Sequence, residues 1–539
     1  MDRRSFLTGW AKSGAVAAPA NHSSSFHQRT LSTDLTPWVP DPIKSPWDAV
    51  RAGHLLRRTM MLPKWTEIDT ILKLTPSDAV DLLLNTPSTP TVPPMADPAD
   101  ISEENFTTSL RTLDSPNASA MRARWASKAQ GLESWYANVM LTSPLSIVEK
   151  MTFFWSGHFT SQYVVGDDYD QAPLLYIQNE LYRNNCLGNF HDLVWNVTLD
   201  GAMLVYLSGI LNVAGTANEN YARELQELFT MGIGNYSEGD VKEAARILTG
   251  WKVGRFRNDP YNNGPFMPYF ERLQHDVGHK TYLGVSFPTI VDADNSENYS
   301  RNTEIKNLID TIFTVKGDVV AKFICRKIYK FFIYTNPSGT DENVISEMAT
   351  IFKKDWDIKA VMSALLKSAH FFDNSNIGCQ IKTPAEFIIG IGRQLGFTNS
   401  MAGNMTTILQ ELFNPPNVSG WTGWHDWITT NTYPVRSTVV TAAIGAMTDQ
   451  NVIDFINQFT DPTDANKLIT ELGALMLPRK LAPSKLAPTR HDDLVSRLVG
   501  SGNQDYEWPN ILSTSPSTAA RNMRDVLTTI CNLPDYQLC

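Results

Sequence analysis

Glu224 and Arg223 are the side chains whose setting in the sequence best suits them to chemistry. They lie within residues 218–232, where apolar residues such as Leu225 and Phe229 recur at helical spacing and predict an amphipathic helix. Glu224 borders the apolar stripe, so we expect a half-buried carboxylate that needs a partner. It could serve as a ligand, as a general acid or base, or as a structural partner of an arginine. Arg223 lies opposite the stripe, where it either binds an anionic group or joins an exposed ladder of salt bridges.

Two histidines stand beside other polar residues. His158 follows an aromatic helical stretch and a glycine, and a helix break at that glycine would turn the imidazole inward. At a helix end the same imidazole would complement the helix dipole. His275, Asp276 and Lys280 lie close together in the predicted loop 252–302. An imidazole, a carboxylate and an ammonium in one short segment suit ligand binding or acid–base chemistry, although a solvated polar loop has the same composition.

The elements around these residues predict where they meet. A capping-box pattern opens a second helix over residues 237–251, so the first and second helices are expected to form an αα-hairpin. The loop 252–302 is far longer than the usual connection of about 4–6 residues, which favours a functional role. If this loop folds back on the hairpin, Glu224, His158 and His275 converge in one cavity. The alternative is that Glu224 pairs with an arginine of the second helix.

A rigid aromatic loop is predicted over residues 412–428. It contains paired prolines, two glycines and three tryptophans: Trp421, Trp424 and Trp427. Aromatic loops of this kind bind sugars and other flat ligands by stacking, or they fill a hydrophobic core. Trp421 and Trp424 are therefore candidate ligand contacts.

The motifs of well-known cofactor sites are missing from the sequence. There is no HExxH zinc motif, no pair of cysteines at zinc spacing, no GxSxG and no glycine-rich phosphate loop. The sequence does not identify a cofactor, and a divalent metal ion bound by the histidines and carboxylates is one candidate. In an oxidising compartment, Cys531 and Cys539 could close a short C-terminal loop by a disulfide.

The composition bounds the fold that must position these residues. The chain has 539 residues, of which 42% are hydrophobic and 19% charged, so a large core is possible. Apolar residues recur mostly at helical spacing, and strand-like alternation is scarce. We therefore predict a mainly α protein, a large multi-helix globular domain with long loops and few strands. The net charge of −10 argues against nucleic acid as a partner, and no apolar run is long enough for a transmembrane segment.

The N-terminus predicts export. Arg3 and Arg4 precede a Ser-Phe-Leu string and a short apolar stretch that ends in a small-x-small site, as in a twin-arginine signal. We therefore predict an export signal over residues 1–20, a linker rich in Ser, Thr and Pro over 21–45, and a helical domain over 46–539. The expected location is the periplasm or the cell surface.

Many segments, in order, resemble the large bacterial family called domain of unknown function 1800. The matching segments are HLLRR (54–58), EKMTFFWSGHF (149–159), QNELYRNNCLGNFHDL (178–193), NENYARELQELFTMGIGNY (218–236), DVKEAARILTGW (240–251), HDVGHKTYLG (275–284), KTPAEFIIG (382–390) and LFNPPNVSGWTG (412–423). The resemblance implies an exported bacterial protein. It also implies a possible exported partner from the family called domain of unknown function 1501, which resembles sulfatases. It implies no reaction.

Two functional hypotheses follow. The first is an exported enzyme, hydrolase-like, that uses a divalent metal ion or a carboxylate–histidine pair. Its catalytic residues would be His158, Glu224, His275 and Asp276, and its anion-binding residues Arg223 and Lys280. The second is a non-catalytic binding or scaffold protein that holds a partner enzyme or a polysaccharide, with Trp421 and Trp424 in its contact surface.

Overall fold

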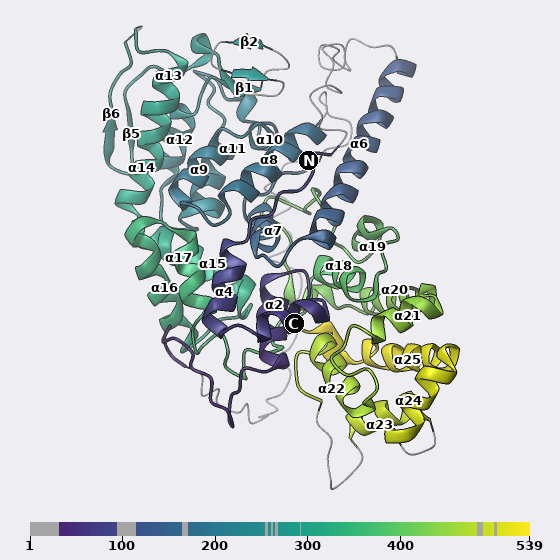
Figure 1. Cartoon of the computed structure of the whole chain (residues 1–539). Helices are drawn as coiled ribbons and strands as arrows, with labels where there is room; N and C mark the ends of the chain where they lie inside the picture. The colour runs from purple at the N-terminus through teal and green to yellow at the C-terminus, as the bar shows by residue number, and fades with distance from the viewer. Residues whose placement is uncertain are drawn as a thin grey trace, which may run out of the picture. The chain divides into compact units, whose positions relative to one another are not determined.

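Helices form most of the described chain (Figure 1). The computed structural model describes residues 32–93, 115–163, 171–253, 257–259, 262–264, 268–291, 293–481, 489–500 and 504–539. Residues 32–539 belong to one compact unit, and the predicted export signal lies outside the described residues. The predicted mainly α fold class with few strands is confirmed.

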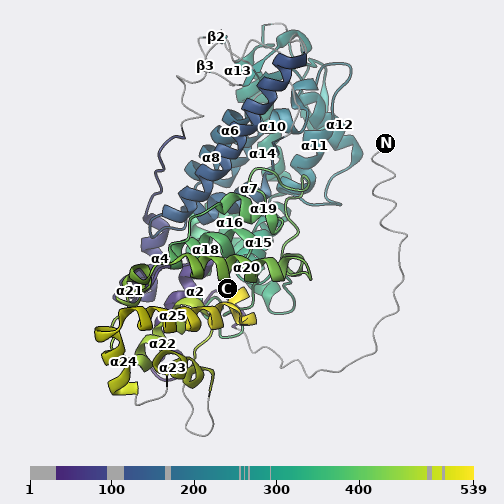
Figure 2. The same cartoon turned by 90° about the vertical axis from the view of Figure 1, so that its right-hand side faces the viewer.

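The first half of the chain supplies the helices that carry three of the predicted site residues, His158, Arg223 and Glu224. They are α2 (Ala49–Thr59), α3 (Trp65–Leu72), α4 (Pro76–Asn85), α6 (Ser115–Thr142), α7 (Val148–His158), α8 (Ala172–Asn185), α9 (Phe190–Thr198), α10 (Gly201–Tyr206), α11 (Asn220–Glu224), the π-helix η4 (Leu225–Thr230) and α12 (Glu238–Ile247). Figure 2 shows α6 beside α8, and these two helices are in contact. The predicted capping box is confirmed at the start of α12, where Ser237 and Asp240 cap each other's backbone.

The second half continues with helices and ends in a helical cluster that includes the C-terminal helix. The helices are α13 (Glu297–Tyr299), the π-helix η6 (Ser300–Ile305), α14 (Lys306–Val315), α15 (Gly317–Phe332), α16 (Asp341–Asp355), α17 (Ile358–Leu366), α18 (Pro384–Leu395), α19 (Met401–Thr407), α20 (Thr432–Ala446), α21 (Asp449–Ile456), α22 (Ala465–Met476), α23 (Arg490–Val499), α24 (Gln504–Thr514) and α25 (Pro516–Cys531). In the last part, α25 packs against α20, α21, α23 and α24 (Figure 2).

Apolar spacing explains the burial of the central helix α15. Val320, Ile324 and Ile328 recur every four residues and are fully buried, because this spacing places them on one face. That face packs against α14 and α16. The ring of Phe331 and the side chain of Lys327 lie on a second face of α15, which borders a cavity described below.

The predicted long loop 252–302 contains short strands and a helical turn. The strands pair as three antiparallel ladders: β1 (Trp251–Val253) with β4 (Pro268–Phe270), β2 (Arg257–Asp259) with β3 (Asn262–Gly264), and β5 (Lys280–Tyr282) with β6 (Val285–Phe287). Each ladder has two strands, so the packing of β5 on α12, rather than a wider sheet, positions this segment.

Part of the predicted linker contacts the helical body. The Trp38 ring stacks on Phe372 with centroids 4.3 Å apart, and the Trp38 amide donates to the backbone oxygen of Lys367 at 2.8 Å. The end of the segment 21–45 therefore contacts the helical body, because the half-buried Trp38 packs its ring against a core phenylalanine.

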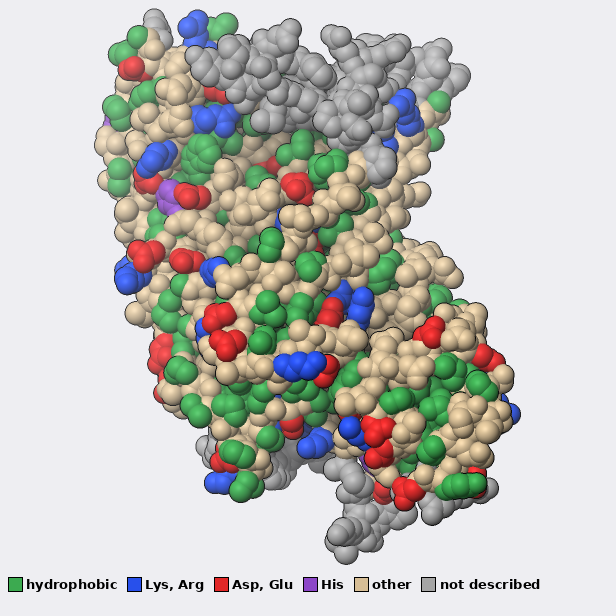
Figure 3. Space-filling model, viewed as in Figure 1, with side chains coloured by type: hydrophobic (Ala, Val, Ile, Leu, Met, Phe, Trp, Pro, Cys, Tyr) green, Lys and Arg blue, Asp and Glu red, His purple; other side chains and the backbone are tan. Residues whose placement is uncertain are grey.

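The surface seen in Figure 3 mixes charges of both signs. Basic and acidic side chains are interspersed on this face instead of forming a basic patch. Within the described residues, every helix is too short or too polar to cross a membrane.

Candidate functional site

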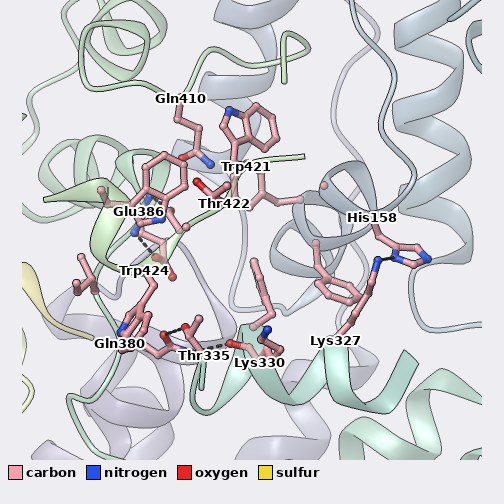
Figure 4. A pocket seen from close by; sticks show the side chains of 18 of the residues that line it. His158, Lys327, Lys330, Thr335, Gln380, Glu386, Gln410, Trp421, Thr422 and Trp424 are labelled. Atoms are coloured by element: carbon pink, nitrogen blue, oxygen red, sulfur yellow. Dashed lines mark hydrogen bonds between the residues drawn. The ribbon is translucent and has the colours of Figure 1, made fainter. Parts of the chain in front are cut away.

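A cavity of about 300 Å³ lies where α7, α15 and the aromatic loop meet (Figure 4). Its aromatic lining residues are Phe153, Phe154, Phe331, Trp421, Trp424 and Trp427. Its polar lining residues are Arg58, His158, Lys327, Lys330, Thr335, Gln380, Thr383, Glu386, Gln410, Ser419 and Thr422. The structure thus brings one predicted catalytic residue, His158, together with the two tryptophans predicted as ligand contacts.

Lys327 reaches this cavity from α15 and contacts His158 at the end of α7 (Figure 4). Lys327 Nζ donates to the backbone oxygen of Leu228 at 2.8 Å and to His158 Nδ1 at 3.0 Å. His158 Nε2 lies 3.1 Å from the backbone oxygen of Phe229, which can only accept, so Nε2 carries the proton. Because Lys327 occupies the lone pair on Nδ1, His158 orients the lysine and is not a free base.

Burial shifts the pKa of both groups in this pair. It lowers the pKa of His158 well below its ordinary value, and the nearby Lys327 charge lowers it further. Burial also lowers the pKa of Lys327 to about 7, and the charge of Lys330 is the second cause. The Phe323 ring lies 4.8 Å from Lys327 Nζ. Near neutral pH, a substantial fraction of Lys327 is therefore an uncharged amine.

A π-helix supplies the two backbone oxygens. The predicted helix 218–232 is α-helical only through α11 and continues as η4. The oxygens of Leu228 and Phe229 lie in its last turn, where helical carbonyl groups run out of backbone donors. The two side chains described above satisfy them. Short π-helical segments occur often at functional sites, and here the segment turns carbonyl groups toward the cavity side of α15.

Glu386 is a buried carboxylate at the start of α18. It is bonded to Lys150, lies 3.9 Å from Arg58 Nη1, and accepts the backbone N–H of Thr383 at 2.7 Å. Burial alone would raise its pKa, but the Lys150 and Arg58 charges hold that pKa below its ordinary value. Glu386 is therefore ionised and neutralised by cations, which makes it a poor proton donor.

The aromatic loop is held against α7 by a close backbone approach. A Cβ atom on Gly420 would lie 2.6 Å from the backbone oxygen of Gly157, and Gly420 has a φ of +78°. The neighbouring Trp421 ring stacks on Phe153 at 6.4 Å between centroids. Trp424 begins the 3₁₀ turn η7 (Trp424–Trp427). This contact places the tryptophans over the cavity.

Cationic groups exceed anionic groups around the cavity. Arg58, Lys330 and the protonated fraction of Lys327 line it, whereas Glu386 is the one carboxylate among its described lining residues. Glu386 is already paired with Lys150, which is not among the lining residues. The lining therefore suits an anionic ligand with a flat or ring-shaped part that stacks on tryptophan.

Arg223 and Glu224 lie outside this cavity lining. Arg223 pairs with Glu219 at 3.0 Å and with Glu238 at 2.8 Å, so it takes part in the exposed ladder that was the alternative interpretation. Glu224 is half-buried, as its position beside the apolar stripe predicted. Burial raises the pKa of Tyr236, and the charge of Glu224 is among the smaller contributions that raise it further.

His275, Lys280 and Asp276 belong to a second polar cluster. His275 Nε2 lies 2.7 Å from Glu304 Oε2, at ion-pair distance although not aligned as a hydrogen bond, and Lys280 Nζ donates to Glu304 Oε1 at 2.8 Å. Asp276 accepts two bonds from Arg246, at 2.8 and 3.2 Å. Burial alone would raise the Asp276 pKa, but Arg246 holds it below its ordinary value. In this cluster Glu304 contacts both Lys280 and His275, and Asp276 pairs with Arg246.

The predicted convergence of Glu224, His158 and His275 in one cavity is therefore wrong. The helix α7 does not break at Gly157 but runs through His158, so the imidazole faces α15 and not the loop. The loop carrying His275 is held instead by Glu304, which lies in η6. The two histidines have different partners for that reason.

The described residues do not assemble a metal site. Nowhere in this part of the chain do three or more His, Cys, Asp and Glu side chains come close enough together to hold a metal ion. Cys531 and Cys539 are free thiols in the structure. The polar residues of the cavity are instead mostly lysine, arginine, amide and hydroxyl groups.

Sequence reasoning missed Lys327, Lys330 and Glu386. A signal was present for Lys327, because it lies four residues after Phe323 and four before Phe331 on a helix, where an apolar residue is expected. For Glu386, the signal was the capping-box spacing from Thr383. Neither signal says that α15 and α18 border the same cavity.

The comparisons with known proteins concern nearly the whole chain. A family model described as "Protein of unknown function (DUF1800)" matches residues 54–538. The chain belongs to this family. The DUF1800 resemblance predicted from the sequence motifs is thereby confirmed, and it covers every residue that lines the cavity. Searches among curated proteins and among solved structures found no significant match.

Proposed function

We propose that this DUF1800 protein acts after export, in the periplasm or at the cell surface, as a binding protein for an acidic saccharide. The observation that carries the proposal is one cavity that combines tryptophans with cations in excess of carboxylates. Tryptophan rings stack on the apolar faces of sugars, and the cations would neutralise carboxylate or sulfate groups. The export part of the proposal rests on the Arg3-Arg4 motif.

Polar groups suited to sugar hydroxyls lie among the charges. Gln410 lines the cavity while its Oε1 accepts the backbone N–H of Ala385 at 2.9 Å, which fixes the side chain in place. Thr422 and Ser419 add hydroxyl groups from the aromatic loop. A volume of about 300 Å³ is at the lower end of the range for small-ligand sites, which favours one or two sugar rings over a long chain segment.

Binding explains the cavity better than hydrolysis does. Glycoside hydrolysis ordinarily uses two carboxylates, one of them protonated. The described lining of the cavity contains one, Glu386, and the Lys150 and Arg58 cations hold it in the ionised form. The metal-dependent alternative has no cluster of ligands in the described part of the chain to support it.

Tryptophan fluorescence and calorimetry test the proposal on the full-length protein. We expect a uronic-acid disaccharide to bind and to change the fluorescence, and the matching neutral disaccharide to bind at least about tenfold more weakly. Lys330→Ala should weaken the acidic ligand about three- to tenfold at low salt. Lys322→Ala is the matched control, since Lys322 is an exposed lysine of the same helix outside the cavity lining. Equal affinity for both disaccharides would refute the anionic preference.

A further inference from the structure

We propose that Lys327 is a nucleophilic amine that forms an imine with an aldehyde or ketone group of the ligand in this cavity. The inference rests on the proposed function in one respect, namely that the ligand carries a negative charge. It adds a carbonyl group to the expected ligand chemistry, and it changes the cavity from a binding site to a site of covalent capture.

The hydrogen bonds of Lys327 fit a neutral amine. An uncharged Nζ has two hydrogens, and the structure supplies two acceptors, the backbone oxygen of Leu228 at 2.8 Å and His158 Nδ1 at 3.0 Å. His158 is itself fixed by its bond to Phe229, so it cannot rotate away without losing that contact. The remaining tetrahedral position on Nζ then holds a lone pair. Because Lys327 lines the cavity, a carbonyl carbon there would be within reach of it.

Other buried lysines of the described chain have different surroundings. Lys150 is bonded to Glu386, and Lys280 donates to Glu304 at 2.8 Å, so both have a carboxylate partner. Lys382 is fully buried, with Nζ 3.8 Å from the centroid of a tyrosine ring, and lies outside the cavity lining. Lys327 thus combines two neutral acceptors, the lack of any ion pair with the described carboxylates, and access to a cavity.

The step balances without a further reactant. The Nζ lone pair attacks the carbonyl carbon, the C=O π pair moves to oxygen, and one Nζ proton is transferred to that oxygen, giving a carbinolamine. The nitrogen lone pair then forms the C=N bond as the C–O bond breaks, and the second Nζ proton joins the departing hydroxide as water. His158 Nδ1 already accepts one of the Nζ hydrogens, so it holds the amine in place while the proton passes from nitrogen to oxygen. His158 is thus a positioning residue that acts through Lys327.

Charged groups on each wall set the pH at which the amine reacts. His158 of α7 is neutral, Lys330 of α15 disfavours a second cation nearby, and Arg58 of α2 is paired with Glu386 of α18. Burial and the Lys330 charge lower the pKa of Lys327 to about 7. An exposed lysine has a pKa of about 10.4, so it is almost entirely protonated at neutral pH.

Pyridoxal 5′-phosphate is a suitable probe, because it joins an aldehyde to a flat ring and an anionic group. The full-length protein is treated with substoichiometric probe at pH 7, reduced with borohydride and digested, and each modified lysine is located by mass spectrometry. We expect Lys327 to be modified at least about tenfold faster than Lys322 or Lys330, with a half-maximal rate near pH 7. His158→Gln should move that midpoint and slow the reaction, an effect that a merely structural role of His158 would not produce.

Two further measurements separate this inference from the proposed function. Pyridoxal without its phosphate should react with Lys327 more slowly, because it lacks the anion. Equal rates for the two aldehydes would support the reactive amine and count against the anionic site. If the phosphate probe binds and quenches tryptophan fluorescence, but Lys327 is modified no faster than Lys322, the imine proposal is overturned while the binding site stands. Lys327→Arg, which keeps a basic side chain but has no primary amine, should bind the probe and carry no reduced adduct at this position.

Discussion

Two polar regions of the molecule each contain a lysine and a histidine, but among the described residues only one of them provides these side chains with a carboxylate partner. In the cluster around Glu304, a buried lysine and a buried histidine both contact one carboxylate. In the cavity, Lys327 and His158 contact each other and two backbone oxygens, and no described carboxylate pairs with them. The first region is closed and its charges are balanced, whereas the second opens to a cavity of about 300 Å³.

The difference shows what distinguishes a structural polar cluster from a ligand site. Removing an ion from water costs several kcal/mol, and a neighbouring opposite charge offsets this within the protein. In the Glu304 cluster the opposite charge comes from the protein itself, so the cluster needs no ligand to neutralise it. The Lys327 pair lacks an anion, and its amine avoids the cost by losing its proton. A bound anion would supply the negative charge that the described part of the protein does not place beside Lys327, and a covalent partner would react with the uncharged amine.

The largest expected effect comes from the closed cluster. Glu304→Gln keeps the side-chain shape but leaves Lys280 buried without a counter-charge and removes the carboxylate that lies beside His275. We expect the free energy of unfolding to fall by about 3–5 kcal/mol, measured by urea denaturation at pH 7. The control is Glu238→Gln, since the Glu238 side chain is 70% exposed beside Arg223, and its loss should cost at most about 1 kcal/mol. Equal losses for the two variants would mean that the buried cluster is not structurally distinct.

The second prediction concerns the wall of the open region. Gly420→Ala places a Cβ atom 2.6 Å from the Gly157 backbone oxygen at a φ of +78°, so the aromatic loop must move away from α7. We expect a loss of about 1–3 kcal/mol in stability and a weaker fluorescence response to the acidic disaccharide. Gly445→Ala is the matched control, because that helical glycine has open space around it. There, alanine should stabilise α20 by up to about 1 kcal/mol. An unchanged ligand response in the Gly420 variant would show that the aromatic loop does not contribute to ligand binding.

The smallest expected effect is a pH dependence in the open region. The folded pKa of Lys327 is about 7 and the unfolded value is about 10.4, so between these pH values the unfolded chain binds more protons. The presence of Lys327 therefore destabilises the fold fully below pH 7, and this effect is lost as pH rises toward 10.4. Relative to Lys327→Met, the wild-type protein should gain about 1 kcal/mol between pH 6 and pH 9, a modest value because the cavity is open to solvent. Parallel stability curves for the two proteins would show that Lys327 titrates as an ordinary lysine.

The sequence by itself determined the fold class, the family and several local elements. Helical periodicity predicted the mainly α architecture, and the Ser237–Asp240 spacing predicted the start of α12. These features depend on residues within a few positions of one another, so a single sequence contains them. The motifs that resemble DUF1800 predicted a relationship that the match over residues 54–538 confirms.

Predictions from the local sequence pattern were wrong where the backbone departs from regular α-helical geometry. The continuous helix expected over 218–232 becomes π-helical in η4, which shifts every later side chain relative to α-helical spacing. Glu227, which regular α-helical spacing would place on the same face as Arg223, accepts a hydrogen bond from Tyr236 instead, at 2.6 Å. Likewise α7 continues through Gly157, because a glycine weakens a helix but does not end it when neighbouring residues such as Trp155 and His158 are buried.

Only the tertiary structure decided which polar residues share a site. Lys327 and His158 are far apart in the chain and meet because α15 packs beside the π-helix and α7 ends there. His275 looked equivalent to His158 in the sequence, yet it pairs with Glu304. Whether a buried cation finds a carboxylate or faces a cavity depends on which distant segment packs against it. A spacing rule within one helix contains no information about that partner, and the partner determines both the pKa and the chemistry.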